Sequence, residues 1–518
     1  MDDERPPSLW WGMWKRFLLA GALIAVLSGA ATATVALNEV SSIAHEVFPE
    51  IAKIKAPKGL IQLKYDGGPQ TFLILGSDRR SGSKNSEERN ATPHSDTILL
   101  VRFDPGHGQT SVMSIPRDLM VNIKTRHGQV YVNEKINAAY TIGSKEGGTN
   151  AGTVLAAETI KREVFPELEL NGIVDVNFAG FIKVVDTLGC AYVNVDHHYY
   201  NLNVGSTETD YTSINLEPGY QKLCYENALD YVRYRHTDSD FVRVARQQDF
   251  LRDLRQQINP ANELGQIENV AKAVGHAIRS NFPASADELI LLAKLVAFSQ
   301  SKPLRQVRFQ TTNVNATYNG GSYVTSTATL EKAALENFLH GDEHASTPTP
   351  KPHSSHSSKK SHHHAPGLSA AAAARALNLY PTTSVGQSEA VKAAIQVPFR
   401  VLYPTLQTGA AEQQMVRPYG LKDESGRPHH AYVVVWRQNL IGAYYDFEGT
   451  DWLNPPLFAH TRSQQIGGRE YKFVDDGAHI HVIGWVSGKV LYWLTNTLLE
   501  ELSNAQMLAI ARSAQGLH

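Results

Sequence analysis

The chain has 518 residues, of which 42% are hydrophobic and 19% charged, so most of it should fold around apolar cores. Its length suggests roughly two to four domains of about 100–200 residues each. The formal net charge of −2 excludes the basic surface expected of a nucleic-acid-binding protein. Any site for an anion must therefore be local and built by clustered arginines.

The first predicted element is a transmembrane helix over residues 17–37, a run that contains no charged residue. At about 1.5 Å per residue, this helix would cover about 30 Å, the thickness of the hydrocarbon layer of a bilayer. Two basic residues directly precede the run and the next one is Lys53, so the positive-inside rule places the tail 1–16 in the cytoplasm and the rest of the chain outside the cytoplasmic membrane. A cleaved signal peptide is the alternative, with small residues near 31–33 at its cleavage site. We favour an uncleaved, single-pass anchor, because the apolar run is longer than a typical signal-peptide core of about 7–15 residues.

Composition divides the rest of the chain into four segments. A stalk over 38–65 leads to a main globular block over 66–337. Ser, Pro, Lys and His dominate residues 338–368, which cannot bury enough apolar surface to become ordered, and we place a disordered linker over 338–385. The histidines of the linker could bind a metal, although a solvated linker is the favoured interpretation. Residues 369–518 recover apolar and aromatic content, and we place a smaller α+β domain over 386–518.

The main block alternates strand-like and helix-like segments. Apolar runs with the length and β-branched content of strands occur at 71–75, 97–103, 110–115 and 190–195. Helical periodicity occurs at 153–164, 179–188, 226–234 and 241–258. Because strands and helices interleave, we expect an α/β fold with a mixed central sheet sandwiched by helices.

Charged residues stand at the ends of three of these strands. They are Asp78 and Arg79 beside the first strand, Asp96 beside the second, and Arg117 and Asp118 beside the third. Loops at strand ends are where α/β folds place groups that bind ligands. The alternative is that these residues are solvated turn residues.

A second charged group lies in residues 231–247, where the sequence is YVRYRHTDSDFVRVARQ. On a helix from Phe241, Arg243 and Gln247 share a face with apolar residues, which should point inward. An unpaired buried guanidinium is costly, so these arginines should face internal carboxylates or an anionic ligand. An Arg–Asp network that pins the helix is the structural alternative. The charged residues of this segment are Arg233, Arg235, Asp240, Arg243 and Arg246.

Together the two groups contain the parts of a phosphoryl-transfer site. Arginine forks match phosphate oxygens, and paired aspartates suit a hard cation such as Mg²⁺ that is also bound by substrate phosphates. Cation and arginines would neutralise the phosphates while a carboxylate orients the nucleophile. The sequence contains no Walker loop, His-Glu-x-x-His or Gly-x-Ser-x-Gly motif that would indicate another chemistry.

Cys190 and Cys224 are the two cysteines of the chain. Their number alone is compatible with free thiols, half of a metal site or one disulfide. A location outside the membrane favours a structural pair, because that compartment is oxidising.

The charged motifs and their neighbours resemble the LytR-CpsA-Psr family of cell-wall polymer ligases over about residues 66–325. Seven segments match the pattern of the family, in its order. They are LILGSDRR (73–80), HSDTILLVRFDP (94–105), SIPRDLMVNI (114–123), KINAAYTIG (135–143), GFIKVVDTLG (180–189), LEPGYQKL (216–223) and ALDYVRYRHTDSDFVRVARQQDFL (228–251).

The resemblance implies a phosphotransferase that moves an anionic glycopolymer, as a sugar phosphate, from a polyprenyl-pyrophosphate carrier onto peptidoglycan. It also implies an apolar tunnel for the lipid and a Mg²⁺ or Mn²⁺ ion at the pyrophosphate. Asp78 and Asp96 would hold the metal or activate the acceptor hydroxyl, with Arg117 as a further catalytic residue. Pyrophosphate binding would fall to Arg79, Arg117, Arg235, Arg243 and Gln247, and a role in completing or bracing that cluster to Arg233, Asp240 and Arg246.

Two departures from the family pattern each introduce a cysteine. Cys190 stands where a second glycine is common, and Cys224 stands at a common Asp-Gly position. We predict that the two cysteines bond to each other. The C-terminal domain lies outside the resemblance: its pattern predicts strands, a hairpin at Ser487 and Gly488 and a closing helix, and we expect an accessory module that binds the wall or a partner.

Two other functions remain open at this point. A pyrophosphatase acting on the same lipid would use the same residues, with water as the nucleophile. A membrane-bound, non-enzymatic sensor of the lipid intermediate would need only the arginines, and the intact pair of aspartates argues against it.

Overall fold

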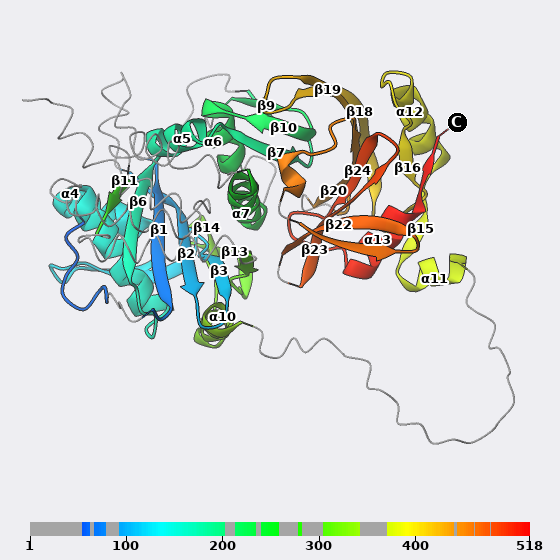
Figure 1. Ribbon diagram of the computed structural model, residues 1–518. Helices are drawn as coiled ribbons and strands as arrows, with labels where there is room; N and C mark the ends of the chain where they lie inside the picture. The colour runs from blue at the N-terminus through cyan, green and yellow to red at the C-terminus, as the bar shows by residue number, and fades with distance from the viewer. Residues whose placement is uncertain are drawn as a thin grey trace, which may run out of the picture.

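A computed structural model describes residues 54–62, 67–78, 93–202, 213–234, 240–257, 278–281, 304–341, 370–439, 443–459, 461–476 and 478–517. These residues form an N-terminal unit up to residue 341 and a C-terminal unit from residue 370 (Figure 1). The expected cytoplasmic tail and transmembrane helix, and most of the stalk and linker, lie outside them. In the ranges given, no helix combines the length and apolar character needed to span a membrane.

A six-stranded sheet is the centre of the N-terminal unit, with strand order β11-β6-β1-β2-β3-β12. The β1–β6 and β3–β12 pairs are parallel and the other pairs are antiparallel, which confirms the expected mixed sheet. Its strands are β1 (Gln70–Ser77), β2 (Ser95–Asp104), β3 (Gln109–Ser114), β6 (Gly172–Asn177), β11 (Ile278–Ser280) and β12 (Leu304–Val307).

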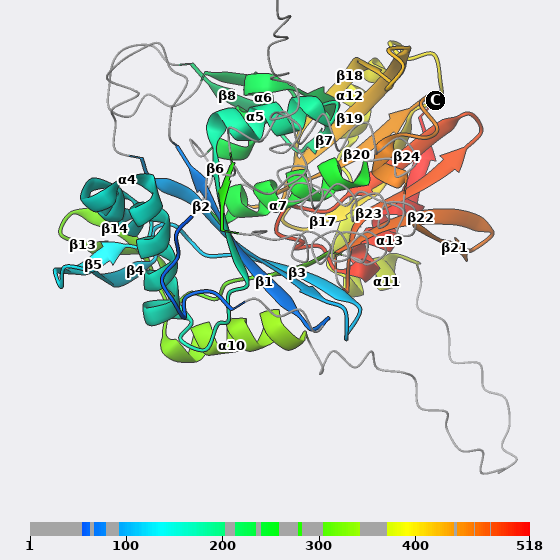
Figure 2. The same cartoon turned by 60° about the vertical axis from the view of Figure 1, so that its left-hand side comes forward.

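The two faces of this sheet are both buried. Successive side chains alternate between the faces of a strand, so Leu73 and Leu75 of β1 share one face. That face packs against α4 (Ala138–Thr159) and α10 (Ala328–His340) in one hydrophobic core (Figure 2). Phe72 and Ile74 point the other way and are also buried. Burial on both sides explains why β1 and β2 each contain a continuous apolar run in the sequence.

A second layer of elements carries the arginine-rich segment. Helices α5, α6 and α7 pack in series, and the β7–β10 hairpin packs with them. The bounds are α5 (Phe178–Thr187), β7 (Ala191–Val195), β8 (Tyr199–Asn201), β9 (Ile214–Leu216), β10 (Gly219–Leu223), α6 (Tyr225–Arg233) and α7 (Asp240–Gln256). Two further hairpins complete the unit, β4 (Met120–Lys124) with β5 (Val130–Lys135) and β13 (Asn313–Tyr318) with β14 (Gly321–Thr325).

The elements expected from the sequence coincide with observed ones, with one difference in length. The helix expected over 153–164 is only the second half of α4, followed by a π-helical turn η1 (Ile160–Val164). A kink at Gly147 and Gly148 divides α4, and Gly148 has φ 72°. These glycines interrupt the periodicity, which is why the sequence pattern did not predict the first half.

The C-terminal unit is built on a seven-stranded sheet, antiparallel throughout, with strand order β18-β19-β20-β24-β23-β22-β21. The C-terminal unit therefore contains more β-strands than we expected of a small α+β domain. The sheet strands are β18 (Glu412–Lys422), β19 (Pro428–Arg437), β20 (Tyr444–Thr450), β21 (Arg462–Ile466), β22 (Arg469–Asp476), β23 (His479–Ser487) and β24 (Val490–Thr495). The other elements are α11 (Ala370–Ala376), β15 (Leu379–Pro381), α12 (Ser384–Ala394), β16 (Leu402–Pro404), β17 (Leu406–Thr408), η3 (Pro456–Phe458), α13 (Asn504–Ser513) and β25 (Ala514–Gly516).

Two features of this unit bear on the sequence predictions. The β23–β24 hairpin turns after Ser487, with Gly488 at φ 66°, and the expected helix near the C-terminus is α13, which the short strand β25 follows. The unit starts earlier than residue 386, because α11 and β15 already belong to it and β15 pairs with β17. An alanine-rich helix next to the Ser- and His-rich segment made that boundary hard to place from composition.

The predicted disulfide between Cys190 and Cys224 is present. It links the residue before β7 to the residue after β10, beside the Ala191–Leu223 pair that ends the hairpin. The bond thus ties the base of the hairpin to the start of α6, the helix that ends at Arg233.

Candidate functional site

The antiparallel pairing of β1 with β2 brings two aspartates together. Ser77 pairs with Ser95, so Asp78 follows one strand where Asp96 begins the other. The backbone of His94 closes the turn, because its carbonyl accepts from the amide of Asp78 (3.1 Å) and its amide donates to Oδ1 of Asp78 (2.6 Å). Two carboxylates from one sheet edge therefore face the same region.

Arg117 reaches this pair from the loop after β3. Its Nη1 donates to Oδ1 of Asp96 at 2.5 Å, and its Nε lies 3.7 Å from Oδ2 of Asp118. Lys135 in turn contacts Oδ1 of Asp118 at 2.9 Å. The Arg117 side chain is mostly buried. The carboxylates of Asp96 and Asp118, on two sides of its guanidinium group, hold it in position.

Helices α6 and α7 add the remaining cations. Arg233 is the last residue of α6, where its guanidinium lies 4.0 Å from the ring centre of Phe178. Arg243 and Gln247 lie one turn apart on α7. Gln247 is held in place by the hydroxyl of Thr97, which donates to its Oε1 at 3.5 Å, and it donates to the Val232 carbonyl at 3.0 Å.

The electrostatics of Asp96 connect these groups into one site. Burial by itself would raise the pKa of this carboxyl group, but Arg117, Arg243 and Arg233 outweigh burial and lower the pKa below its usual value. Asp96 is therefore ionised across the physiological pH range. Because each of these three arginines lowers the pKa of Asp96, each guanidinium group lies close enough to interact with its charge.

Asp78 behaves in the opposite way. Burial raises its pKa above the ordinary value, the hydrogen bond from the His94 backbone lowers it, and the negative charge of Asp96 raises it again. Neighbouring carboxylates whose pKa values are driven apart are typical of an acid–base pair. A raised pKa makes Asp78 the better proton acceptor of the two.

Arg246 does not join the other arginines at the aspartates. It is fully buried, with Nε donating to the hydroxyl of Tyr199 (3.0 Å) and Nη1 donating to the carbonyl of Tyr234 (2.8 Å). Its guanidinium also lies over the Tyr199 ring at 4.5 Å. Of the two roles expected for Arg246, completing or bracing the cluster, these contacts favour bracing.

The other expected site residues lie outside the described part of the chain. They are Arg79 and Arg235, together with the side chain of Asp240, whose backbone begins α7. The structure thus brings together Asp78, Asp96, Arg117, Arg233, Arg243 and Gln247.

Sequence reasoning missed a buried polar group beneath Asp78. Asp175 of β6 accepts from the hydroxyl of Tyr140 (2.7 Å) and from that of Thr153 (3.1 Å). Burial raises the pKa of Asp175, whereas Tyr140, Ser77 (the residue before Asp78) and Thr153 lower it. The signal was a lone aspartate in the apolar strand GIVDVN, which required a buried partner.

The donors at this site suit a divalent cation only in combination with a ligand. Within the described ranges, no group of three or more His, Cys, Asp or Glu side chains is arranged to hold a metal. Asp78 and Asp96 provide two carboxylates, and Mg²⁺ is usually bound by one or two carboxylates plus substrate phosphates and water. Together with the arginines, these carboxylates have the chemistry that a diphosphate and its counter-ion would require.

Several known proteins are similar to this chain in sequence or in fold. The chain is 26% identical to Biofilm regulatory protein A of Streptococcus mutans serotype c over 263 residues, which is 50% of this chain and 60% of that protein. It is 26% identical to Regulatory protein MsrR of Staphylococcus aureus over 219 residues, 42% of this chain and 58% of that protein. It therefore spans less than two thirds of the length of these relatives. Among solved structures, TagV of B. subtilis has a TM-score of 0.41 and 23% identity, covering 53% of this chain and 96% of TagV.

A family match covers the whole N-terminal unit. Residues 34–339, more than half of the chain, match the family. This range includes Asp78, Asp96 and helix α7. The C-terminal unit lies beyond the matched range. The chain therefore belongs to the LytR_cpsA_psr family.

Proposed function

We propose that this protein transfers an anionic glycopolymer, as a sugar phosphate, from a polyprenyl-pyrophosphate carrier to peptidoglycan on the outer side of the cytoplasmic membrane. The observation that carries the proposal is the convergence of Arg117, Arg233 and Arg243 on Asp96, next to a second carboxyl group with a raised pKa. Three cations around two carboxylates suit a dianionic pyrophosphate, and family membership agrees with that chemistry.

The geometry suggests how the reaction would proceed. A sugar hydroxyl of the acceptor attacks the phosphorus next to the donor sugar, and its oxygen forms the new P–O bond. The bond to the bridging oxygen breaks, and polyprenyl phosphate leaves with the electron pair. Asp78 takes the hydroxyl proton, while the arginines neutralise the charge on the phosphates. Asp96 stays ionised and holds Arg117 in place.

Mg²⁺ or Mn²⁺ fits the same residues. Asp78 and Asp96 would bind the ion together with pyrophosphate oxygens, and the bound ion would offset negative charge on the phosphates. Arg117 pairs with Oδ1 of Asp96, so Oδ2 of Asp96 would be the oxygen that binds the ion.

A regulatory function is the second candidate, because both curated relatives carry the word "regulatory" in their names. A regulator would bind the lipid-linked pyrophosphate through the arginines without turning it over. A pyrophosphatase would use the same residues with water as the nucleophile. Only the fate of the sugar phosphate distinguishes these functions from transfer.

The test uses the full-length protein in detergent, Mg²⁺ and a polyprenyl-pyrophosphoryl glycan labelled in its sugar-proximal phosphate, with and without peptidoglycan oligomers. We expect label to move onto the oligomers as a phosphodiester, and Asp96→Asn to reduce this transfer by at least about 100-fold. Asp104→Asn is the matched control, because Asp104 lies at the other end of β2 and also contacts an arginine, Arg102.

The outcomes separate the three functions. Transfer that is lost in Asp96→Asn and kept in Asp104→Asn supports the ligase and its site together. Release of sugar phosphate without transfer to the oligomers would mean a pyrophosphatase. Binding of the donor without turnover, unaffected by Asp96→Asn, would refute the enzymatic proposal and leave a regulator.

A further inference from the structure

Helix α7 has two functional faces. Arg243 and Gln247 lie on the face directed at Asp96 and Thr97. Asp249 lies two residues after Gln247, which on an α-helix places it about 200° away, on the opposite face. Arg252, three residues further, shares that opposite face with Asp249. The second face is therefore directed away from the aspartates.

The opposite face of α7 binds the C-terminal unit through buried charges. Arg252 donates to Asp249 and its Nη1 lies 3.6 Å from Oδ2 of Asp476 on β22. His481 of β23 lies with Nε2 3.6 Å from Oδ2 of Asp249 and with Nδ1 3.2 Å from Glu500. Four of these five residues, Arg252, Asp249, Asp476 and His481, are each at most 8% exposed. Charges this deeply buried hold their position only when their partners are present.

Apolar contacts surround this charged cluster. At the start of α7, Val242 and Ala245 pack against Leu498 of the C-terminal unit. The β7–β10 hairpin inserts Tyr192 and Tyr220 into an apolar cluster of the C-terminal unit, whose members include Leu421, Trp452, Leu457 and Trp493. Both views show α7 between the central sheet and the C-terminal sheet (Figures 1 and 2).

A second polar path reaches α7 from the C-terminal unit. Tyr444 of β20 stacks on the ring of His197, with centroids 4.1 Å apart. His197 contacts Asp196 (3.1 Å), and Asp196 accepts from the hydroxyl of Tyr199 (2.5 Å). Tyr199 is the residue that holds Arg246 of α7. Contacts from three strands of the C-terminal sheet, β20, β22 and β23, thus lead to the same helix.

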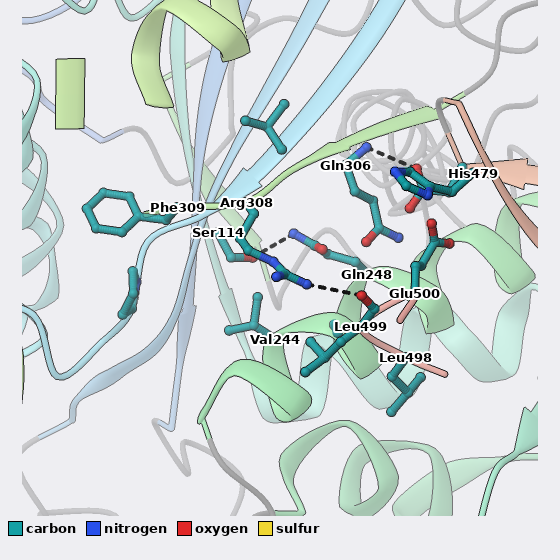
Figure 3. A pocket seen from close by; sticks show the side chains of 14 residues that line it. Ser114, Val244, Gln248, Gln306, Arg308, Phe309, His479, Leu498, Leu499 and Glu500 are labelled. Atoms are coloured by element: carbon teal, nitrogen blue, oxygen red, sulfur yellow. Dashed lines mark hydrogen bonds between the residues drawn. The ribbon is translucent and has the colours of Figure 1, made fainter. Parts of the chain in front are cut away.

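Between these contacts lies a cleft of about 340 Å³, lined by both units (Figure 3). Its walls include Pro116 and Val244, the sequence neighbours of Arg117 and Arg243. Arg308 crosses it and donates to the carbonyl of Leu499 at 3.1 Å. The elements that carry the two arginines are therefore walls of the interface itself.

We propose that the C-terminal unit is a structural part of the active site, because its docking on the back of α7 holds Arg243 and Gln247 at the aspartates. Asp476 and Tyr444 are then positioning residues, although neither contacts the site. This inference rests on the proposed function only for the identity of the ligand, a pyrophosphate. It replaces the accessory role expected from the sequence with a role in the geometry of the site.

Asp476→Asn in the full-length protein tests the inference. We measure the affinity for inorganic pyrophosphate with Mg²⁺ by calorimetry, and the hydrogen exchange of amides in residues 240–257. Loss of the charge opposite Arg252 should weaken pyrophosphate binding by about tenfold and speed exchange in α7. Asp475→Asn is the matched control, because the neighbouring Asp475 pairs with Arg462 inside the C-terminal unit and should change neither quantity.

Further variants keep the test decisive if Asp476→Asn folds poorly. Tyr444→Leu acts on the second path and should produce the same two effects, and Asp476→Glu should partly restore both. Unchanged affinity and unchanged exchange in α7, with only a lower melting temperature, would overturn the inference. Amide hydrogen exchange is measured without any catalytic turnover. A protein that binds pyrophosphate but transfers no glycan therefore refutes the proposed function alone. A wild-type protein that binds no pyrophosphate refutes both.

Discussion

At the scale of single residues, the site depends on two carboxyl groups that the protein treats differently. Asp96 lies among three guanidinium groups and stays ionised, whereas Asp78 is buried beside a negative neighbour and binds protons more readily. The difference arises from position, since both residues stand at the same edge of one sheet. Under the proposed function, this difference favours Asp78 as the proton acceptor and Asp96 as the partner of the arginines.

The pH dependence of transfer should therefore report on Asp78. A base must be ionised to act, so the rate should fall as the pH falls through the pKa of Asp78, which burial raises above the ordinary value for aspartate. We expect the acid limb of kcat/KM to have its midpoint above that ordinary value at low Mg²⁺ concentration, and to shift to lower pH as Mg²⁺ binds the ionised carboxylate. Asp78→Asn should lose about 100-fold or more in rate and leave no acid limb in the residual activity. An unchanged acid limb in that variant would assign the titration to another group.

At the scale of elements, the disulfide fixes the position at which α6 begins. The Cys190–Cys224 bond joins the two ends of the β7–β10 hairpin and directly precedes the helix that carries Arg233. Cys190 and Tyr225, at the two ends of this junction, both have positive φ values, at 71° and 51°. The chain is thus sharply bent on both sides of the bond, and the bond holds these bends together.

Removing the disulfide should destabilise the protein without abolishing the fold. The chain-entropy model gives about 3–4 kcal/mol for a loop of this length. The double variant Cys190→Ser with Cys224→Ser should melt several degrees lower than the wild type, as measured by calorimetry. Dithiothreitol should lower the melting temperature of the wild type towards that of the variant and leave the variant unchanged. If the reductant affects both proteins equally, the loss comes from another cause.

At the scale of the whole molecule, the two units share a buried polar interface. The amide of Tyr220 donates to Oε2 of Glu448 at 3.1 Å, and the hydroxyl of Tyr419 donates to the same carboxyl group. Asn194 donates to both oxygens of Asp446, at 3.0 and 2.9 Å. Burial raises the pKa of Glu448 to about 8, although the hydrogen bonds from Tyr419 and Tyr220 lower it. The interface therefore contains a carboxyl group that is protonated near neutral pH.

This group should make stability depend on pH in a defined direction. A carboxyl group with a folded-state pKa of about 8 and an ordinary value of 4.5 binds a proton on folding between those pH values. Its contribution to stability is complete below the unfolded pKa and is lost as the pH rises through about 8. The melting temperature of Glu448→Gln should therefore fall less than that of the wild type between pH 6 and pH 9, by a few degrees.

Glu470→Gln serves as the control for this prediction, because Glu470 is exposed on β22 of the same sheet. Its melting temperature should follow that of the wild type at each pH. Parallel curves for Glu448→Gln and the wild type would mean that Glu448 is ionised in the folded protein throughout this range.

The sequence by itself determined the local parts of this protein. Strands buried on both faces favour continuous apolar runs, so β1 and β2 could be predicted together with the charged residues at their ends, and β3 from its shorter apolar segment. The residues that the structure then brought together, Asp78, Asp96 and Arg117, were visible for that reason. The pairing of Cys190 with Cys224 followed from the family resemblance and is confirmed.

Only the tertiary structure determined which charged side chains lie next to each other. Arg243 and Arg246 are three residues apart on one helix, and periodicity places both on its buried side. The packing of the tyrosines around Arg246, and of Asp96 near Arg243, separates their roles. The partner of Arg252 lies more than two hundred residues away in Asp476, across a linker without pattern. Contacts between distant segments depend on how whole units pack, and local sequence contains no record of that packing.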